Sequence, residues 1–344
     1  MAARKLPLQP QAEPRWLPIV MWHGMGDSCC SEYSMGAVAD GIRAALPGVL
    51  VHSIAIGGNT AADVFSSFFG SVNAQVDFVC DQLLSMQELQ GGYVAVGFSQ
   101  GGQFMRAVAQ RCQHMGPKMQ VLVTMGGQHQ GVMDLPGCWQ PAHSNSTPSL
   151  YCRVMQELVG FGVYSWLVQG RVVQAQYFKD PYQLDSYLQR SAFLADINNE
   201  VAVRRHAAYR DNLASLQRLV LYQFEQDDMV VPKESSHFGW FNGSQLLGLR
   251  EQDIYIQDWI GLRQLDESGR LLLLHAPGRH MQFELDWFVQ EVVHKHLAVP
   301  AAGATPAVGA AEAAGAMAAR GTAEAEAAAA GVAAEEGSDG RARW

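Results

Sequence analysis

The sequence has few positive charges, and none of them is clustered. Lys and Arg number 24 against 33 Asp and Glu, which gives a formal net charge of −9. Without a basic patch, the chain is not expected to bind nucleic acid or an anionic membrane surface. It also lacks any stretch of the roughly 18 apolar residues that span a bilayer, so no transmembrane segment is expected. No group of His, Cys, Asp and Glu has metal-ligand spacing, and we expect neither a metal nor a cofactor.

The N-terminal residues 1–15 lack the uninterrupted apolar core of a secretory signal peptide, because prolines break them up. Either the protein is not secreted, or the natural chain starts further upstream. The six cysteines are Cys29, Cys30, Cys80, Cys112, Cys138 and Cys152. An even count is compatible with disulfides and equally with reduced cytosolic thiols, and spacing fixes no pairing. Asn145 and Asn242 begin Asn-X-Ser/Thr triplets and are candidate glycosylation sites.

The composition divides the chain into three parts. Residues 1–15 form a polar leader without clear structure, and residues 16–298 carry the large apolar side chains. Residues 299–344 consist mainly of Ala, Gly and Glu. Nothing in this last segment can pack on a core, so we expect a disordered tail without chemistry.

Six short apolar runs between these ends predict buried strands. They span residues 17–22, 49–56, 93–98, 120–125, 218–224 and 271–276. The runs are continuously apolar rather than alternating, which is typical of parallel strands covered on both faces. Stretches with helical spacing, such as residues 63–86 and 101–112, lie between them. The sequence therefore predicts an α/β fold, with a mostly parallel central sheet and helices on both faces.

One long segment, residues 132–217, interrupts the alternation of strands and helices. No strand candidate fits it, whereas several pieces have helical spacing. We expect an inserted helical cap over the site. Its apolar stretches around residues 158–168 and 191–197 are candidates for an apolar groove at that site, and equally for the core of the cap itself.

The pentapeptide GFSQG, residues 97–101, fits the G-x-S-x-G pattern of a nucleophile elbow. It follows an apolar strand and precedes an amphipathic helix. A sharp turn there forces the serine into strained backbone angles, and Gly97 and Gly101 let neighbouring elements approach. The N–H groups at the start of the helix then point toward Ser99, where an oxyanion forms during acyl transfer. Ser99 is the candidate nucleophile, although a helix-capping serine is the plainer alternative.

The base and the acid are expected after the last two strands, in the chain order nucleophile, acid, base. His280 lies in the loop after residues 271–276 and is the candidate base. Asp227 and Asp228 follow residues 218–224, and as neighbours they cannot both face His280. The D-x-x-V-P pattern of many hydrolases favours Asp228. His129 stands out of order for a base, and we expect it to be structural or to support the site from behind.

A second oxyanion donor normally comes from a loop after an early strand. The segment His23-Gly24-Met25-Gly26 directly follows the first predicted strand. Its glycines let backbone N–H groups turn inward. The backbone N–H groups of Met25 and Gln100 are therefore the candidate pair.

With these residues identified, the chain resembles the palmitoyl-protein thioesterases, α/β hydrolases of the lysosome, and most of all their type 1 members. The resemblance rests on five segments, WHGMGDSCC, GFSQGGQFMRAVAQRC, GGQHQGV, SAFLADIN and HFGWF. It runs from about residue 17 to 297 and leaves out the leader and the tail.

The resemblance implies an α/β-hydrolase fold with Ser99 as nucleophile, His280 as base and Asp227 as acid. Asp227 is preferred over Asp228 because the match continues without a gap through residues 238–241. The implied disulfides are Cys29–Cys30, Cys80–Cys112 and Cys138–Cys152. Such bonds imply folding in an oxidising compartment, the secretory pathway leading to a lysosome or vacuole.

The reaction that the resemblance implies is hydrolysis of a long-chain fatty-acyl thioester on the cysteine of a protein or peptide. The substrates would be S-palmitoylated proteins or peptides and related acyl thioesters. Two other functions stay open. An oxygen-ester lipase or carboxylesterase uses the same triad, and a catalytically inactive acyl-binding module would bind long chains without turnover.

Overall fold

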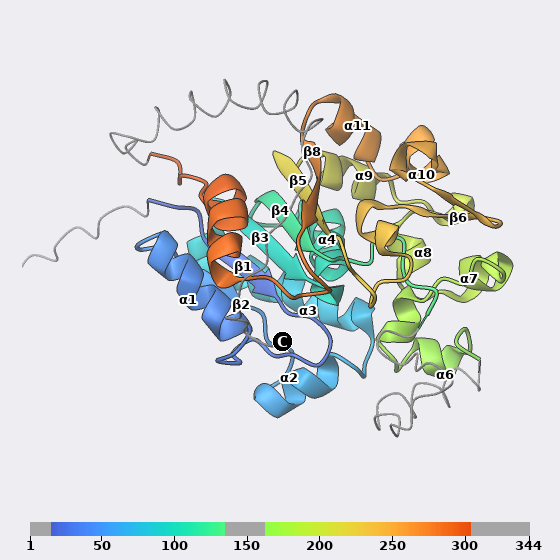
Figure 1. Cartoon of the computed structure of the whole chain (residues 1–344), viewed down its shortest axis with the longest axis horizontal. Coiled ribbons are helices and arrows are strands. Elements are labelled where there is room, and N and C mark those ends of the chain that lie inside the picture. The colour runs from blue at the N-terminus through green and yellow to red at the C-terminus, as the bar shows by residue number, and fades with distance from the viewer. Residues whose placement is uncertain (1–14, 135–161, 304–344) are drawn as a thin grey trace, which may run out of the picture.

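The computed structural model describes residues 15–134 and 162–303, and its centre is a six-stranded parallel sheet (Figure 1). The strands are β1 (Ile19–Trp22), β2 (Val51–Ser53), β3 (Tyr93–Phe98), β4 (Met119–Met125), β5 (Arg218–Phe224) and β8 (Leu271–Ala276). Their order is β2-β1-β3-β4-β5-β8, and every neighbouring pair runs parallel. All six predicted strands are confirmed, as is the α/β fold class with a parallel sheet.

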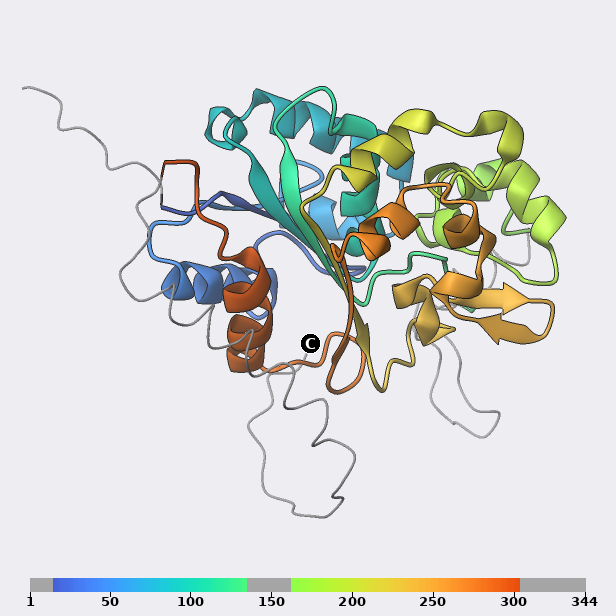
Figure 2. The ribbon, with the colours of Figure 1, turned by 90° about the horizontal axis from the view of Figure 1, so that it is seen from above.

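Helices cover both faces of the sheet (Figure 2). One face carries α1 (Met35–Ala45) and the C-terminal pair α12 (Leu285–Phe288) and η6 (Val289–Leu297), the latter a π-helix. The other carries α3 (Val72–Ser85), α4 (Gln100–Cys112), α9 (Ala207–Ala214) and α11 (Leu262–Glu267). Side chains alternate between the faces along each strand: in β1, Ile19 and Met21 enter one core, whereas Val20 and Trp22 enter the other.

The helical stretch predicted over residues 63–86 is two helices. α2 (Thr60–Ser66) ends before Gly70, which has a φ of +130°, and α3 starts after Ser71. The Ser71 side chain accepts a hydrogen bond from the backbone N–H of Ala74, the usual N-cap arrangement. Gly70 itself donates its N–H to the carbonyl oxygen of Arg171 in the insert, so the break joins two distant parts of the chain.

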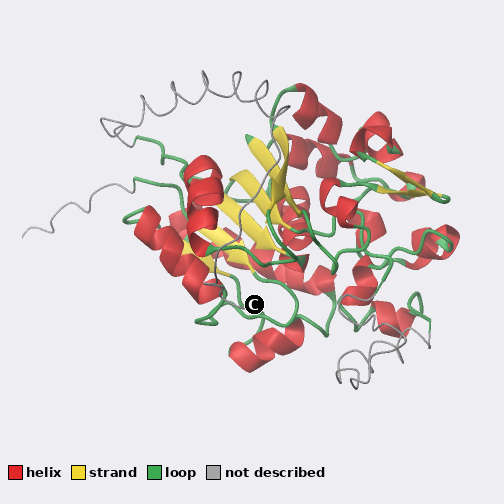
Figure 3. Ribbon diagram, viewed as in Figure 1, coloured by secondary structure: helices red, strands yellow, loops and turns green. Residues whose placement is uncertain are grey.

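The described part of the insert, residues 132–134 and 162–217, is helical and contains no strand (Figure 3). Besides α9, its elements are α6 (Trp166–Gln169), η2 (Gln174–Tyr177), α7 (Leu184–Arg190), α8 (Leu194–Ile197) and η3 (Ala202–Arg204). Its buried apolar side chains join the core formed by α3 and α4. The insert is therefore packed into the domain rather than attached as a separate body.

A small region between β5 and β8 was not predicted. Besides α11, it contains an antiparallel hairpin and three short helices, to the right of the sheet in Figure 2. Its elements are η4 (Lys233–His237), β6 (Trp240–Asn242), β7 (Gln245–Leu247), η5 (Leu249–Glu251) and α10 (Asp253–Ile256). One further short helix, η1 (Gln87–Leu89), lies outside this region and precedes β3. Three-residue strands with mostly exposed side chains give too little apolar pattern to be recognised.

The two ends of the described domain lie together. The backbone N–H of Leu17 donates to the carbonyl of Val299, and that of Ala301 donates to the carbonyl of Arg15. The predicted leader up to residue 14 and the tail from residue 304 lie outside the described residues. Within the described residues, no helix is both long and apolar enough to cross a membrane.

Candidate active site

Ser99 lies at the turn between β3 and α4 with a φ of +52°, a value that non-glycine residues rarely adopt. The turn is possible because glycines flank it. A Cβ atom on Gly97 would fall within 3 Å of the backbone of Gly101, and one on Gly101 would meet the carbonyl oxygens of Trp22 and His23. The strained turn thus places Ser99 at the carboxyl edge of the sheet, at the N-terminus of a 13-residue helix.

Two loops at the same edge bring His280 and Asp227 to this serine. Nε2 of His280 lies 2.9 Å from Oγ of Ser99, and Nδ1 of His280 lies 2.7 Å from Oδ2 of Asp227. The Asp227 side chain is fully buried, and 9% of the His280 side chain is exposed. The three residues therefore form one hydrogen-bonded line from a buried carboxylate to the serine oxygen.

The neighbouring carboxylates Asp227 and Asp228 have opposite surroundings. Oδ1 of Asp227 accepts hydrogen bonds of 2.9 Å from the backbone N–H groups of both Met229 and Val230, which fixes the carboxylate. Asp228 is half-exposed and forms an ion pair with the exposed Arg279. The structure brings Asp227, and not Asp228, to His280.

The loop of His23 to Gly26 passes directly over Ser99. A Cβ atom on Gly24 would lie 3.0 Å from Cβ of Ser99. The loop is tied at both ends, by His23 Nε2 at 3.1 Å from Oδ1 of Asp63 and by the Gly26 N–H, which donates to Oγ of Ser67. Met25 lies between these ties and lines the cleft, and Gln100 is the first residue of α4.

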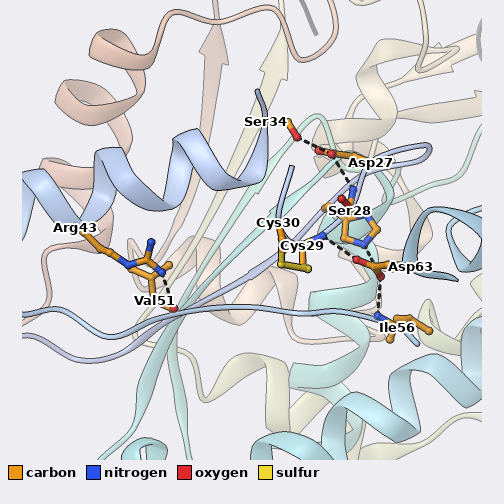
Figure 4. Close-up of a disulfide and its surroundings, with 10 residues drawn as sticks. Asp27, Ser28, Cys29, Cys30, Ser34, Arg43, Val51, Ile56 and Asp63 are labelled. Carbon is orange, nitrogen blue, oxygen red and sulfur yellow. Dashed lines mark hydrogen bonds and ion pairs between the residues drawn. A yellow bond between two sulfur atoms is a disulfide. The ribbon is translucent and has the colours of Figure 1, made fainter. Parts of the chain in front are cut away.

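Asp63, on α2, is a buried anchor for this region (Figure 4). Its carboxylate also accepts the backbone N–H groups of Cys29 and Ile56, at 2.8 and 2.7 Å. Burial lowers the pKa of His23, but the hydrogen bond and charge of Asp63 outweigh it and leave that pKa raised. Burial raises the pKa of Asp63, yet the bonds from His23, Cys29 and Ile56 leave it lowered. The pair is therefore a buried ion pair in mildly acidic solution.

Two disulfides are present in the described part of the chain. Cys29 is joined to its neighbour Cys30 beside Asp63 (Figure 4), and Cys80 on α3 is joined to Cys112 at the end of α4. These are the pairs that the resemblance implies. Cys138, Cys152 and Asn145 lie outside the described residues, and Asn242 is exposed at the end of β6.

The loop after β4 supplies a contact that the sequence did not indicate. Nε2 of Gln128 lies 3.1 Å from Oγ of Ser99. The next residue, His129, is fully buried, and its ring is hydrogen-bonded to Arg106 and Thr124. Burial and the charge of Arg106 hold the pKa of His129 well below its usual value, so its ring is neutral.

A cleft of about 570 Å³ opens over Ser99. Its apolar lining includes Met35 and Val38 of α1, Phe98 of β3, and Met281 and Phe283 after β8. Asp27, Asp228 and Arg279 give it a polar side.

Among the described residues of the insert, only Tyr177 lines this cleft. Of the apolar residues proposed from the sequence as a groove, Trp166 and Leu167 are exposed and do not line the cleft. The other described ones, such as Val168, Phe193 and Leu194, are buried in the core instead. They therefore fit the plainer of the two interpretations. Within the described residues, no group of three or more His, Cys, Asp and Glu is arranged to hold a metal ion.

Comparison with known proteins gives one family. The family model described as palmitoyl protein thioesterase matches residues 18–280. Palmitoyl-protein thioesterase 1 of Caenorhabditis elegans is 44% identical, over 81% of this chain and 91% of that protein. A palmitoyl-protein thioesterase-dolichyl pyrophosphate phosphatase fusion of Schizosaccharomyces pombe is 35% identical, over 77% of this chain and 41% of that protein. The lysosomal thioesterase PPT2 homolog of Drosophila melanogaster is 29% identical, over 81% and 89%.

Proposed function

Because the chain belongs to the palmitoyl protein thioesterase family, we propose that it hydrolyses long-chain fatty-acyl thioesters on the cysteines of proteins or peptides. The observation that carries this proposal is the hydrogen-bonded line from Asp227 through His280 to Ser99, which ends in an open cleft. Such a line activates a serine for acyl transfer, and the family supplies the class of acyl group.

The first half of the reaction acylates the serine. His280 accepts the Ser99 proton at Nε2 while Oγ attacks the thioester carbonyl carbon. Asp227 holds the proton on Nδ1, so that Nε2 is free to accept, and its charge stabilises the imidazolium. The C–S bond then breaks and the cysteine leaves as a thiolate, which takes up the proton from His280.

The second half returns the free enzyme. His280 removes a proton from water, the resulting hydroxide attacks the acyl carbon, and the C–Oγ bond breaks as Ser99 regains its proton. In both halves the carbonyl oxygen carries a negative charge. The proposed donors to it are the backbone N–H groups of Met25 and Gln100, which belong to the tied loop and to the first turn of α4.

We place the acyl chain, at least next to its carbonyl, along the apolar wall of the cleft. Pockets that bury small ligands have volumes of roughly 300–1,000 Å³, and the volume here falls within that range. Each methylene that is buried contributes about 0.8 kcal/mol. We therefore expect kcat/KM to rise by up to about fourfold per methylene and to level off near the length of palmitate. Measurement of kcat/KM with a series of S-acyl peptides tests this. A kcat/KM that does not change with chain length would show that the cleft does not bind the acyl chain.

Two alternatives use the same geometry. An oxygen-ester lipase or carboxylesterase would turn over esters as well as thioesters, and a short-chain esterase would peak at a few carbons. An inactive acyl-binding module would bind long chains without release of product.

The decisive experiment compares an S-palmitoyl peptide with its O-palmitoyl serine analogue. We expect turnover of the thioester with a clear preference over the ester, because thiolate leaves more readily than alkoxide. Ser99→Ala should melt like the native protein and lose hydrolysis to background. Equal turnover of both peptides would favour a general esterase, and a trapped acyl group on another residue would reject Ser99.

The cellular setting is part of the proposal. The relative from Drosophila melanogaster is named lysosomal, and the disulfides Cys29–Cys30 and Cys80–Cys112 suit an oxidising compartment. We propose a lysosome or vacuole reached through the secretory pathway, with S-palmitoylated proteins as substrates and no cofactor. Asn242 is exposed and accessible to glycosylation there. Six titratable thiols in the native protein would contradict this setting.

A further inference from the structure

The oxygen of Ser99 has a second hydrogen-bond partner besides His280. It is the side-chain amide of Gln128, whose Nε2 lies 3.1 Å from Oγ. Gln128 is only 2% exposed, yet it lines the cleft in which the substrate is proposed to bind. It is thus a buried polar group in contact with the reacting atom.

The direction of this bond follows from the proton count. Oγ of Ser99 carries one proton, and Nε2 of His280 receives it because Asp227 keeps the ring proton on Nδ1. Oγ therefore has only lone pairs left, so Gln128 donates an N–H. This orientation leaves Oε1 of Gln128 buried without a hydrogen-bond partner among the described residues. A buried amide normally satisfies its oxygen, so the contact with Ser99 determines how this one is turned.

The backbone on both sides of Gln128 is fixed from within the protein. Its own N–H donates to Oε1 of Gln103 at 2.8 Å. The ring of His129 stacks on Phe238, accepts a hydrogen bond from Nε of Arg106 at 3.2 Å, and donates one to Oγ1 of Thr124 at 3.0 Å. Gln128 therefore stands on a rigid, buried support rather than on a mobile loop.

We propose that Gln128 is a further catalytic residue, which donates a hydrogen bond to Oγ of Ser99 whenever that oxygen carries charge. This inference rests on the proposed function. As His280 removes the proton, Oγ becomes partly anionic, and a hydrogen bond to an anion is roughly twice as strong as one to a neutral oxygen. The bond therefore stabilises the transition state more than the resting enzyme. In the second half-reaction, Oγ is the leaving atom, and the same donor stabilises it until His280 returns the proton.

Two variants test the donor. Gln128→Met keeps the length and removes the amide, and we expect kcat/KM to fall about 10- to 100-fold, at or below the range measured for one oxyanion donor. Gln128→Glu places a carboxyl group at the same point. The protonated acid can donate to Oγ, whereas the carboxylate cannot. The activity of Gln128→Glu relative to the native enzyme should therefore rise as the pH falls through the pKa of the introduced carboxyl group.

The matched control is Gln113→Met, which removes another buried glutamine amide, one whose partners among the described residues are Met119 and Ser215. It should lose stability like Gln128→Met and keep native kcat/KM. If the amide of Gln128 only stabilised the fold, both variants would have a lower melting temperature, and their kcat/KM values would not differ. The pH-dependent recovery of Gln128→Glu has no counterpart in a merely structural role.

The outcomes are separable from those of the proposed function. The native enzyme is assayed first on the S-palmitoyl peptide, and absence of turnover there would reject the proposed function alone. The rate at which a fluorophosphonate labels Ser99 reports the activation of Oγ without any thioester, and it should fall in Gln128→Met but not in Gln113→Met. The proposal is overturned if Gln128→Met keeps kcat/KM and the labelling rate within threefold of native, or if the Gln128→Glu ratio is flat with pH.

Discussion

Asp227 and Asp228 are chemically identical neighbours whose roles are set by their surroundings. The Asp227 carboxylate is buried, held by two backbone N–H groups, and bonded to His280. Asp228 is half-exposed and paired with an exposed Arg279. An exposed ion pair contributes about 0–1 kcal/mol, whereas a buried carboxylate facing a histidine determines the tautomer of that ring.

The two aspartates can be separated by matched substitutions. We expect Asp227→Asn to lower kcat by about 10⁴, because an amide favours the wrong tautomer of His280. Asp228→Asn should stay within a few-fold of native, because it loses only a surface ion pair. Steady-state kinetics on an S-palmitoyl peptide measures both. A larger loss in Asp228→Asn than in Asp227→Asn would reverse the assignment of the acid.

At the scale of elements, the loop over Ser99 is held by α2 rather than by its own sequence. The carboxylate of Asp63 accepts hydrogen bonds from the ring of His23 and from the backbone N–H groups of Cys29 and Ile56. Oγ of Ser67 accepts one from the backbone N–H of Gly26. One short helix thus fixes both the loop that carries Met25 and the turn of the adjacent disulfide. The backbone donor proposed for the oxyanion depends on this anchor.

Asp63→Asn tests that dependence. An amide has one acceptor oxygen, so one of the three donors must face an NH₂ group. We expect the free energy of unfolding to fall by about 3 kcal/mol or more, because a buried charge pair loses one partner. In the protein that remains folded, kcat should fall more than KM rises, since Met25 is displaced. Urea unfolding and steady-state kinetics measure these effects.

The control is Asp40→Asn on α1. Asp40 also pairs with a cationic side chain, that of Arg43, but the pair is exposed. Its loss should change the free energy of unfolding by less than about 1 kcal/mol and leave kcat unaffected. Native kcat in folded Asp63→Asn would show that the loop does not need its anchor.

For the whole molecule, the sequence predicted what depends on local pattern and missed what depends on packing. The six strands were recognisable because strands buried on both faces are continuously apolar, and the turn at Ser99 because glycines must flank it. Spacing alone did not separate Asp227 from Asp228. The segment GGQHQGV contributes to the family resemblance but gives Gln128 no role, because its contact with Ser99 arises only when the loop after β4 meets the turn after β3.

The lining of the cleft shows the same limit. The apolar segments of the insert have the composition of a groove, but most of their described apolar side chains lie in the core, and Trp166 and Leu167 are exposed. The wall beside Ser99 comes from α1 and from the segment after β8, which lie far apart in the sequence. Composition gives the amount of apolar surface, and tertiary contacts decide which of it stays open.

Four histidines whose pKa values are lowered by burial make the free energy of unfolding depend on pH. Burial lowers the pKa of His52 and His129, and that of His237 and His296 to about 4. Each is neutral in the fold while the unfolded chain takes up a proton near pH 6.5. The stability that these neutral rings contribute to the free energy of unfolding is therefore fully present above pH 6.5, and it is lost as the pH falls through the folded pKa. His23 has a raised pKa and acts in the opposite direction, so acidification should destabilise the protein on balance.

His296 on η6 allows this effect to be isolated. Both of its ring nitrogens are buried without a hydrogen-bond partner among the described residues, beside Tyr222 and near Arg218, Glu291 and Lys295. With folded and unfolded pKa values of about 4 and 6.5, its titration removes about 1–2 kcal/mol between pH 7.5 and pH 5. His296→Phe cannot titrate, so its free energy of unfolding relative to native should rise by that amount over this range. Any packing strain of the larger ring cancels, because it is the same at both values of pH. Urea unfolding at pH 7.5 and pH 5 measures the difference, and a variant whose stability runs parallel to native across this range would show that His296 is not neutral in the fold.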